Sequence, residues 1–137
     1  MEFGFEKLEV WKEARILCQA INDQILSNVE IKDYPLKDQI NRSTASVMDN
    51  ISEGQGRGGN KEFIQFLYLS RGSISEVKSQ LIRAMDREYI SEKQYLELIK
   101  HCSEILRMLN GLIKYLKTSD FTGNKFSPVS SGGGTKN

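Results

Sequence analysis

Residues 91–117 read SEKQYLELIKHCSEILRMLNGLIKYLK and carry the clearest helical pattern of the chain. Ser91 and Gln94 have the spacing of a capping box, and Ile90 and Tyr95 that of a hydrophobic staple, so we expect a helix to begin here. Apolar side chains then alternate spacings of three and four residues, at Tyr95, Leu98, Cys102, Ile105, Leu109, Leu112 and Leu116. This heptad seam predicts a long helix packed lengthwise against other helices.

A second apolar row runs beside this seam, at Ile99, Leu106 and Ile113. A helix of an isolated bundle needs only one apolar stripe, because its other side faces water. The extra row therefore indicates either burial against a neighbouring subunit or an unusually wide core.

Three further helical patterns precede this segment, and no segment alternates with the period of a β-strand. The first spans about residues 5–28; the second begins at Pro35 and stops at Gly54; the third begins with Asn60 as its N-cap. The stripe of the first helix is Leu8, Trp11, Cys18, Ile21 and Ile25, and that of the second is Leu36, Ile40, Val47 and Ile51. The stripe of the third helix is Phe63, Phe66, Leu67, Ser70, Ile74, Val77 and Leu81. Short connections between long helices predict an all-α, antiparallel up-down four-helix bundle over residues 1–117, followed by a flexible Ser/Gly-rich tail over 118–137.

The composition is that of an ordinary globular domain, with 39% hydrophobic and 27% charged residues among 137. The net charge of +1 means that any nucleic-acid role must rest on local patches of charge. Cys18 and Cys102 lie in apolar stripes and are interpreted as small buried hydrophobes rather than a disulfide. The sequence shows neither a secretion signal nor an apolar run of membrane-spanning length, so a cytoplasmic location is expected.

Several segments, in their order and spacing, carry a family resemblance. They are residues 5–11 (FEKLEVW), 39–42 (QINR), 50–54 (NISEG), 61–67 (KEFIQFL), 71–73 (RGS) and 105–113 (ILRMLNGLI). Over residues 5–117 the chain resembles the bacterial four-helix bundle proteins called 23S rRNA-intervening-sequence proteins.

The resemblance implies a four-helix bundle that assembles into a homopentameric, barrel-like ring. It extends more distantly to the accessory protein of diversity-generating retroelements, a basic pentamer that works with a reverse transcriptase and nucleic acid. This chain departs from the pattern in its near-neutral charge and in the short turn at Asp33-Tyr34-Pro35-Leu36.

The glycine-rich segment 54–59 suggests one candidate site. Gly54, Gly56 and Gly59 match a dinucleotide-binding spacing, but a helix precedes them where that motif requires a strand, so they indicate a tight turn. Arg57 and Lys61 flank the start of the third helix, where free N–H groups favour an anion. Either a phosphate binds here or both are solvated charges. An antiparallel hairpin turning at 54–59 would place Arg42 and Arg71 at one level, and both would add to the site.

The alternative is a polar network between helices. Its expected members are Arg42, Ser46, Asn50, Glu53, Arg71, Ser73, Glu76 and Gln80. Buried polar groups need hydrogen-bond partners, and such groups can fix register and subunit number in an assembly. This structural reading is preferred to ligand binding, and the two are compatible.

No catalytic, metal or cofactor site is predicted. Glu97, His101 and Glu104 share a helical face, but a di-iron bundle needs a Glu-x-x-His pair on two helices and the chain has one histidine, expected to face solvent. The serines and cysteines have no nearby general base. We therefore expect a non-enzymatic homo-oligomeric adaptor that binds RNA or DNA phosphates through Arg42, Arg57, Lys61 and Arg71. The competing hypothesis is a protein-binding scaffold, and the sequence names neither the nucleic acid nor a protein partner.

Overall fold

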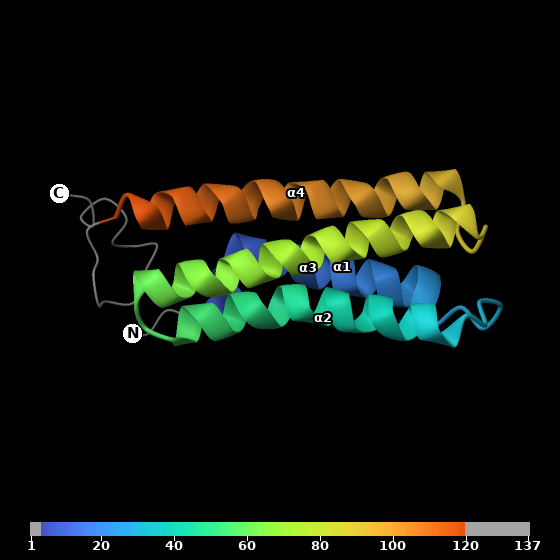
Figure 1. Ribbon diagram of the computed structural model, residues 1–137, viewed down its shortest axis with the longest axis horizontal. Coiled ribbons are helices and arrows are strands. Elements are labelled where there is room, and N and C mark those ends of the chain that lie inside the picture. Colours follow the sequence, from blue (N-terminus) through green and yellow to red (C-terminus); the bar gives the residue numbers. More distant parts are fainter. Residues whose placement is uncertain (1–3, 120–137) are drawn as a thin grey trace.

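The computed structural model describes residues 4–119, which form four α-helices and no β-strand (Figure 1). The helices are α1 (Glu9–Ile21), α2 (Tyr34–Gly56), α3 (Asn60–Asp86) and α4 (Glu92–Lys117). They lie side by side along the long axis of the molecule, and α1–α2, α2–α3, α3–α4 and α1–α4 are the contacting pairs. The predicted all-α, four-helix architecture is confirmed. The predicted tail lies outside the described residues beyond Ser119.

One apolar core runs through the bundle, with contributions from all four helices. The predicted stripes of α2 and α3 are buried, except that Phe66 is half-buried. In α4, Leu112 is half-buried and Ile113 takes its place in the core. The heptad seam therefore drifts towards the second apolar row in the last turns, because a straight helix has 3.6 rather than 3.5 residues per turn.

The first helix is shorter than its sequence pattern suggests. A single 3₁₀ turn at Phe5–Lys7 is followed by an extended residue, Leu8, before α1 begins. At its other end, α1 widens into a π-helical turn over Asn22–Leu26. The core-facing residues are Val10, Ala14, Leu17, Ile21 and Ile25, whereas Trp11 and Cys18 are only half-buried.

Side chains cap the starts of α2 and α4, but not those of α1 and α3. The Asp33 carboxylate caps α2 by accepting a hydrogen bond of 3.2 Å from the Leu36 N–H, and Ser91 and Gln94 form the predicted capping box of α4. The predicted N-cap Asn60 is instead the first residue of α3, after an extended Gly59. Asn60 is buried, and its side-chain amide has no hydrogen-bond partner in the part of the chain that the structure describes.

The glycine-rich turn starts two residues later than predicted. Helix α2 continues through Gly54 to Gly56, and the left-handed residue of the turn is Gly58, with a φ of 98°. Gly54 serves a different purpose: a Cβ there would lie 2.6 Å from Phe66 Cβ and 3.0 Å from Phe63 Cδ1. The absence of a side chain at Gly54 lets α3 approach α2 closely.

Replacing Gly54 by alanine should therefore destabilise the fold. Real Cβ atoms do not approach others at 2.6 Å, so the two helices would have to move apart. Overpacking of this kind costs about 1–3 kcal/mol of unfolding free energy, measurable by urea denaturation. Gly56→Ala is the matched control, because nothing lies within 4 Å of its Cβ position. Equal stability of the two variants would contradict the close-approach role of Gly54.

Candidate functional site

Small polar side chains fill the contact between α2 and α3. Ser70 Oγ donates a hydrogen bond of 2.9 Å to the Val47 carbonyl, and Ser73 Oγ donates one of 2.8 Å to Ser46 Oγ. The Asn50 side-chain amide donates to Ser46 Oγ at 2.9 Å. Ser70 and Ser73 are buried, so these bonds satisfy groups that would otherwise be costly inside the bundle.

A second set of polar contacts lies further from the glycine turn. Gln80 Nε2 donates a hydrogen bond of 3.0 Å to Ser43 Oγ, and Arg83 Nη2 donates one of 2.7 Å to Gln39 Oε1. Residue numbers fall along α2 as they rise along α3, so the two helices run in opposite directions. The other polar side-chain atom of Gln80, Oε1, is buried and has no hydrogen-bond partner among residues 4–119.

The predicted network is therefore formed by part of its expected members. The expected members Ser46, Asn50, Ser73 and Gln80 belong to it, together with Ser43 and Ser70. Glu53 is instead exposed, and Glu76 is exposed on the rim of a polar hollow of about 580 Å³. That hollow is lined by Gln39, Arg42, Ser43, Ser46, Glu76 and Gln80.

The predicted alignment of Arg42 with Arg71 is wrong. Arg42 adjoins Ser43, which is level with Gln80, whereas Arg71 adjoins Ser70, which is level with Val47. At 1.5 Å of rise per residue, the two arginines are separated by roughly 10 Å along the bundle. The early placement of the turn explains only part of this error: counted from Gly58, residue 42 would be level with residue 74, whereas Ser43 pairs with Gln80.

Two of the four predicted cations are neutralised by carboxylates of their own helix. Arg42 pairs with Asp38, and both side chains are exposed. Arg57 pairs with Glu53 at 3.0 Å, and its guanidinium lies 5.0 Å from the centre of the Phe66 ring. Ion pairs one helical turn apart are local surface features. Arg57 also contacts α3 through the Phe66 ring, whereas Arg42 is paired only within α2 among residues 4–119.

The other two predicted cations have no carboxylate partner among residues 4–119. Lys61 is exposed in the first turn of α3. Arg71 Nη1 donates a hydrogen bond of 2.9 Å to the Asn110 side-chain oxygen on α4. The guanidinium carbon of Arg71 lies 4.7 Å from the centre of the Tyr68 ring. The Lys117 ammonium lies 5.4 Å from the same ring. Tyr68, Asn110 and Lys117 were missed in the sequence, where only the three-residue spacing of Tyr68 and Arg71 hints at the contact.

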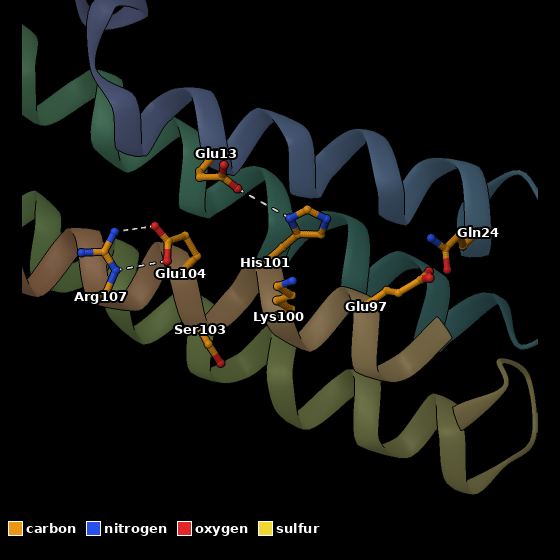
Figure 2. A pocket seen from close by; sticks show the side chains of 8 residues that line it. All are labelled: Glu13, Gln24, Glu97, Lys100, His101, Ser103, Glu104 and Arg107. Atoms are coloured by element: carbon orange, nitrogen blue, oxygen red, sulfur yellow. Dashed lines mark hydrogen bonds and ion pairs between the residues drawn. The ribbon is translucent and has the colours of Figure 1, made fainter. Parts of the chain in front are cut away.

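A hollow of about 740 Å³ lies on a different side of the molecule, along α1 and α4 (Figure 2). His101 was expected to face solvent, but it is half-buried and its Nδ1 lies 3.5 Å from Glu13 Oε1 on α1. Glu104 is paired with Arg107 (Figure 2). Within residues 4–119, no three His, Cys, Asp or Glu side chains come together as metal ligands.

Both cysteines are free thiols held in their protonated form. Burial raises the pKa of Cys102 to about 12. Burial, with a smaller contribution from Asp49, raises the pKa of Cys18 to about 11, and its thiol lies 3.5 Å from the Thr44 carbonyl oxygen. Thiols are nucleophilic as thiolates, so neither cysteine is activated at neutral pH.

A polar cluster around Asp33 joins the loop before α2 to the loop after α3. Besides capping α2, the Asp33 carboxylate accepts a hydrogen bond of 2.6 Å from Arg87 Nη1 and one of 3.0 Å from the Tyr89 hydroxyl. Desolvation raises the pKa of Asp33, but the hydrogen bonds from Tyr89, Leu36 and Arg87 outweigh it and hold the pKa below its usual value. The hydrogen bond to Asp33 also raises the pKa of Tyr89.

Comparison with known proteins decides the family. The family model described as "23S rRNA-intervening sequence protein" matches residues 6–111, which is most of the chain. The chain belongs to this family. None of the curated proteins matches it.

A solved protein structure shares the fold of this chain. It is a protein of unknown function from the S23 ribosomal protein family of Bacteroides thetaiotaomicron. The TM-score is 0.68 at 23% sequence identity, and the alignment covers 77% of this chain and 98% of that chain. At this identity the likeness concerns the fold alone. Within residues 4–119 no helix is long and apolar enough to cross a membrane.

Replacing Gln80 by alanine should destabilise the bundle, because the buried Ser43 hydroxyl then loses its partner. A buried polar group left unsatisfied costs about 1–3 kcal/mol, which urea denaturation would detect. Glu53→Ala is the control: it removes an exposed ion pair and should change stability by less than about 1 kcal/mol. The network account fails if Glu53→Ala is the more damaging of the two.

The Asp33 cluster predicts a pH-dependent contribution to stability. Because the folded-state pKa is lowered, the carboxylate stabilises the fold above its unfolded pKa of about 3.9, and this contribution is lost as the pH falls through the folded pKa. The melting temperature of Asp33→Asn should lie below that of the wild type at pH 7, and the gap should narrow below pH ~4. The exposed Asp86→Asn provides the control for net charge. A gap that stays constant down to pH ~2 would contradict this assignment.

Proposed function

We propose that this family member is a non-catalytic adaptor that works as a homo-oligomeric ring in the cytoplasm. Each subunit is an antiparallel up-down four-helix bundle, and the family resemblance favours a pentamer. The ring engages RNA or DNA phosphates through cations repeated around it, and a protein such as a reverse transcriptase is a further candidate partner. Repetition makes weak sites effective, because a few contacts per subunit become many along one bound strand.

The observation that carries self-association is an apolar zone on the outer face of α3 and α4. Asn110 contacts Arg71 on α3, and Leu106 and Ile99 lie four and eleven residues before it, on the same side of α4. On α3, Ile82 lies eleven residues after Arg71 and shares its side. We define the apolar zone as Ile82, Leu96, Ile99 and Leu106.

The apolar zone is only partly covered within one subunit. Ile82 is 43% exposed and Leu96 56% exposed, while Ile99 and Leu106 are half-buried. Ile99 and Leu106 belong to the second apolar row of α4, which exceeds what a single bundle has to bury. A second subunit packed on this zone would remove it from water, which is the main favourable term in subunit association.

A scaffold that binds only proteins is the second candidate. It is favoured by the ion pairs of Arg42 with Asp38 and Arg57 with Glu53, which leave these two arginines little free charge for phosphates. An enzymatic role is not proposed, since burial keeps both thiols protonated.

The apolar zone can be tested by changing its most exposed members. The double variant Ile82→Glu with Leu96→Glu should fall from the wild-type oligomer to monomer in multi-angle light scattering, because subunit contact would bury two charges. Val29→Glu is the control, as Val29 is 77% exposed in the loop between α1 and α2. Circular dichroism verifies that the helices persist. A wild-type monomer, or an unchanged oligomer in the double variant, would contradict the proposal.

A further inference from the structure

The other end of the same outer face carries a cluster of cations around an aromatic ring. Tyr68 is 36% exposed, with the Arg71 guanidinium carbon 4.7 Å and the Lys117 ammonium 5.4 Å from its ring centre. Two like charges are thus held beside one ring. Electrostatic attraction to the ring offsets part of their mutual repulsion. This cluster lies where the start of α3 meets the end of α4 (Figure 1).

Among residues 4–119, Arg71 is positioned by neutral groups only. One of its donors binds the Asn110 side-chain oxygen at 2.9 Å, and its plane is supported by Tyr68. A guanidinium has five N–H donors, so most of them remain for a ligand, already oriented. Arg42 differs from Arg71, because the Asp38 carboxylate offsets its charge. Arg71 keeps its full charge available for a ligand.

Two exposed lysines extend this cluster. Lys61 lies seven residues, or about two turns, before Tyr68 on the same side of α3. Lys114 lies between Asn110 and Lys117 at spacings of four and three on α4. None of these cations is paired with a carboxylate within residues 4–119, and Glu62 follows Lys61 directly and so points to another side of the helix. We name this surface the Tyr68 patch: Lys61, Tyr68, Arg71, Asn110, Lys114 and Lys117.

We infer that the Tyr68 patch binds single-stranded nucleic acid, with a base stacked on the Tyr68–Arg71 pair and the flanking phosphates on its four cations. An exposed aromatic ring between cations is how proteins bind single strands without reading sequence, because every base has a face to stack. A duplex keeps its bases stacked on one another, so it would offer only its phosphates here. An acidic peptide would use the cations but leave Tyr68 without a role.

This inference rests on the proposed nucleic-acid role and names its site. It retains Lys61 and Arg71 from the sequence-predicted cations and replaces Arg42 and Arg57 by Lys114 and Lys117. The patch borders the apolar zone on the same face of α3 and α4. Each subunit of a ring would therefore place one patch beside a subunit contact, and one strand would run from patch to patch.

The test measures binding of the full-length protein to a fluorescent 12-nucleotide oligouridine by anisotropy, with oligothymidine and a 12-base-pair duplex as parallel probes. The wild type should bind single strands more tightly than the duplex. Four phosphate contacts predict a slope of log affinity against log salt of about −2.8, and Arg71→Ala with Lys117→Ala should reduce it to about −1.4. Tyr68→Ala should weaken binding by about fivefold to 150-fold, and Tyr68→Phe should retain it.

The control variant is Arg42→Ala with Arg57→Ala, which removes the same charge from carboxylate-paired arginines and should leave affinity within about twofold. If this control weakens binding more than Arg71→Ala with Lys117→Ala, the Tyr68 patch is wrong while the nucleic-acid role stands. If Tyr68→Ala binds as tightly as the wild type, base stacking is overturned. If the wild type binds no probe at low salt, both the patch and the nucleic-acid role fail. Light scattering of the same samples reports separately on the ring.

Discussion

The fold depends on the close contact between α2 and α3. Gly54 removes the side chain that would separate the helices near their turn, and Ser43, Ser46, Ser70 and Ser73 keep the interface narrow further along. Small hydroxyl-bearing residues allow this approach only because each hydroxyl has a hydrogen-bond partner within the helix pair. The contact fixes the register of α2 against α3. That register in turn decides which side of α3 is left to meet α4.

Since α2 uses one side of α3, the cations of α3 are divided between two surfaces. Arg83 faces α2 and donates a hydrogen bond to Gln39, whereas Arg71 donates to Asn110 on α4 and lies over the Tyr68 ring. The outer face of α3 and α4 then has two parts: an apolar zone at one end and the Tyr68 patch at the other. In our account the first part joins subunits and the second binds a nucleic-acid strand. The low net charge of the chain is compatible with this, because four cations gather in the Tyr68 patch while carboxylates neutralise Arg42, Arg57, Arg87 and Arg107.

Sequence reasoning predicted what depends on local periodicity and capping. The four helices, the stripes of α2 and α3 and the capping box of Ser91 follow from spacing alone. It failed where tertiary contact overrode a local signal. Gly54 had the appearance of a helix end but is required inside α2 by Phe66, and Asn60 had the appearance of a cap but is buried in α3. Arg42 and Arg71 were wrongly placed at one level, because counting residues from the turn does not reproduce the contacts Val47–Ser70 and Ser43–Gln80 that set the register. Lys117 could not be assigned to the Tyr68 ring from sequence, since their 49-residue separation is closed only by the packing of α4 on α3.

The most direct test of this account is native mass spectrometry of the full-length protein purified at low salt without nuclease. The account predicts a ring-sized homo-oligomer that carries single-stranded nucleic acid, and that loses it, without loss of subunits, when the salt concentration is raised. A monomer, or a ring that arrives free of nucleic acid and acquires none when an oligouridine is added, would contradict the claim that the outer face of α3 and α4 both joins subunits and binds a strand.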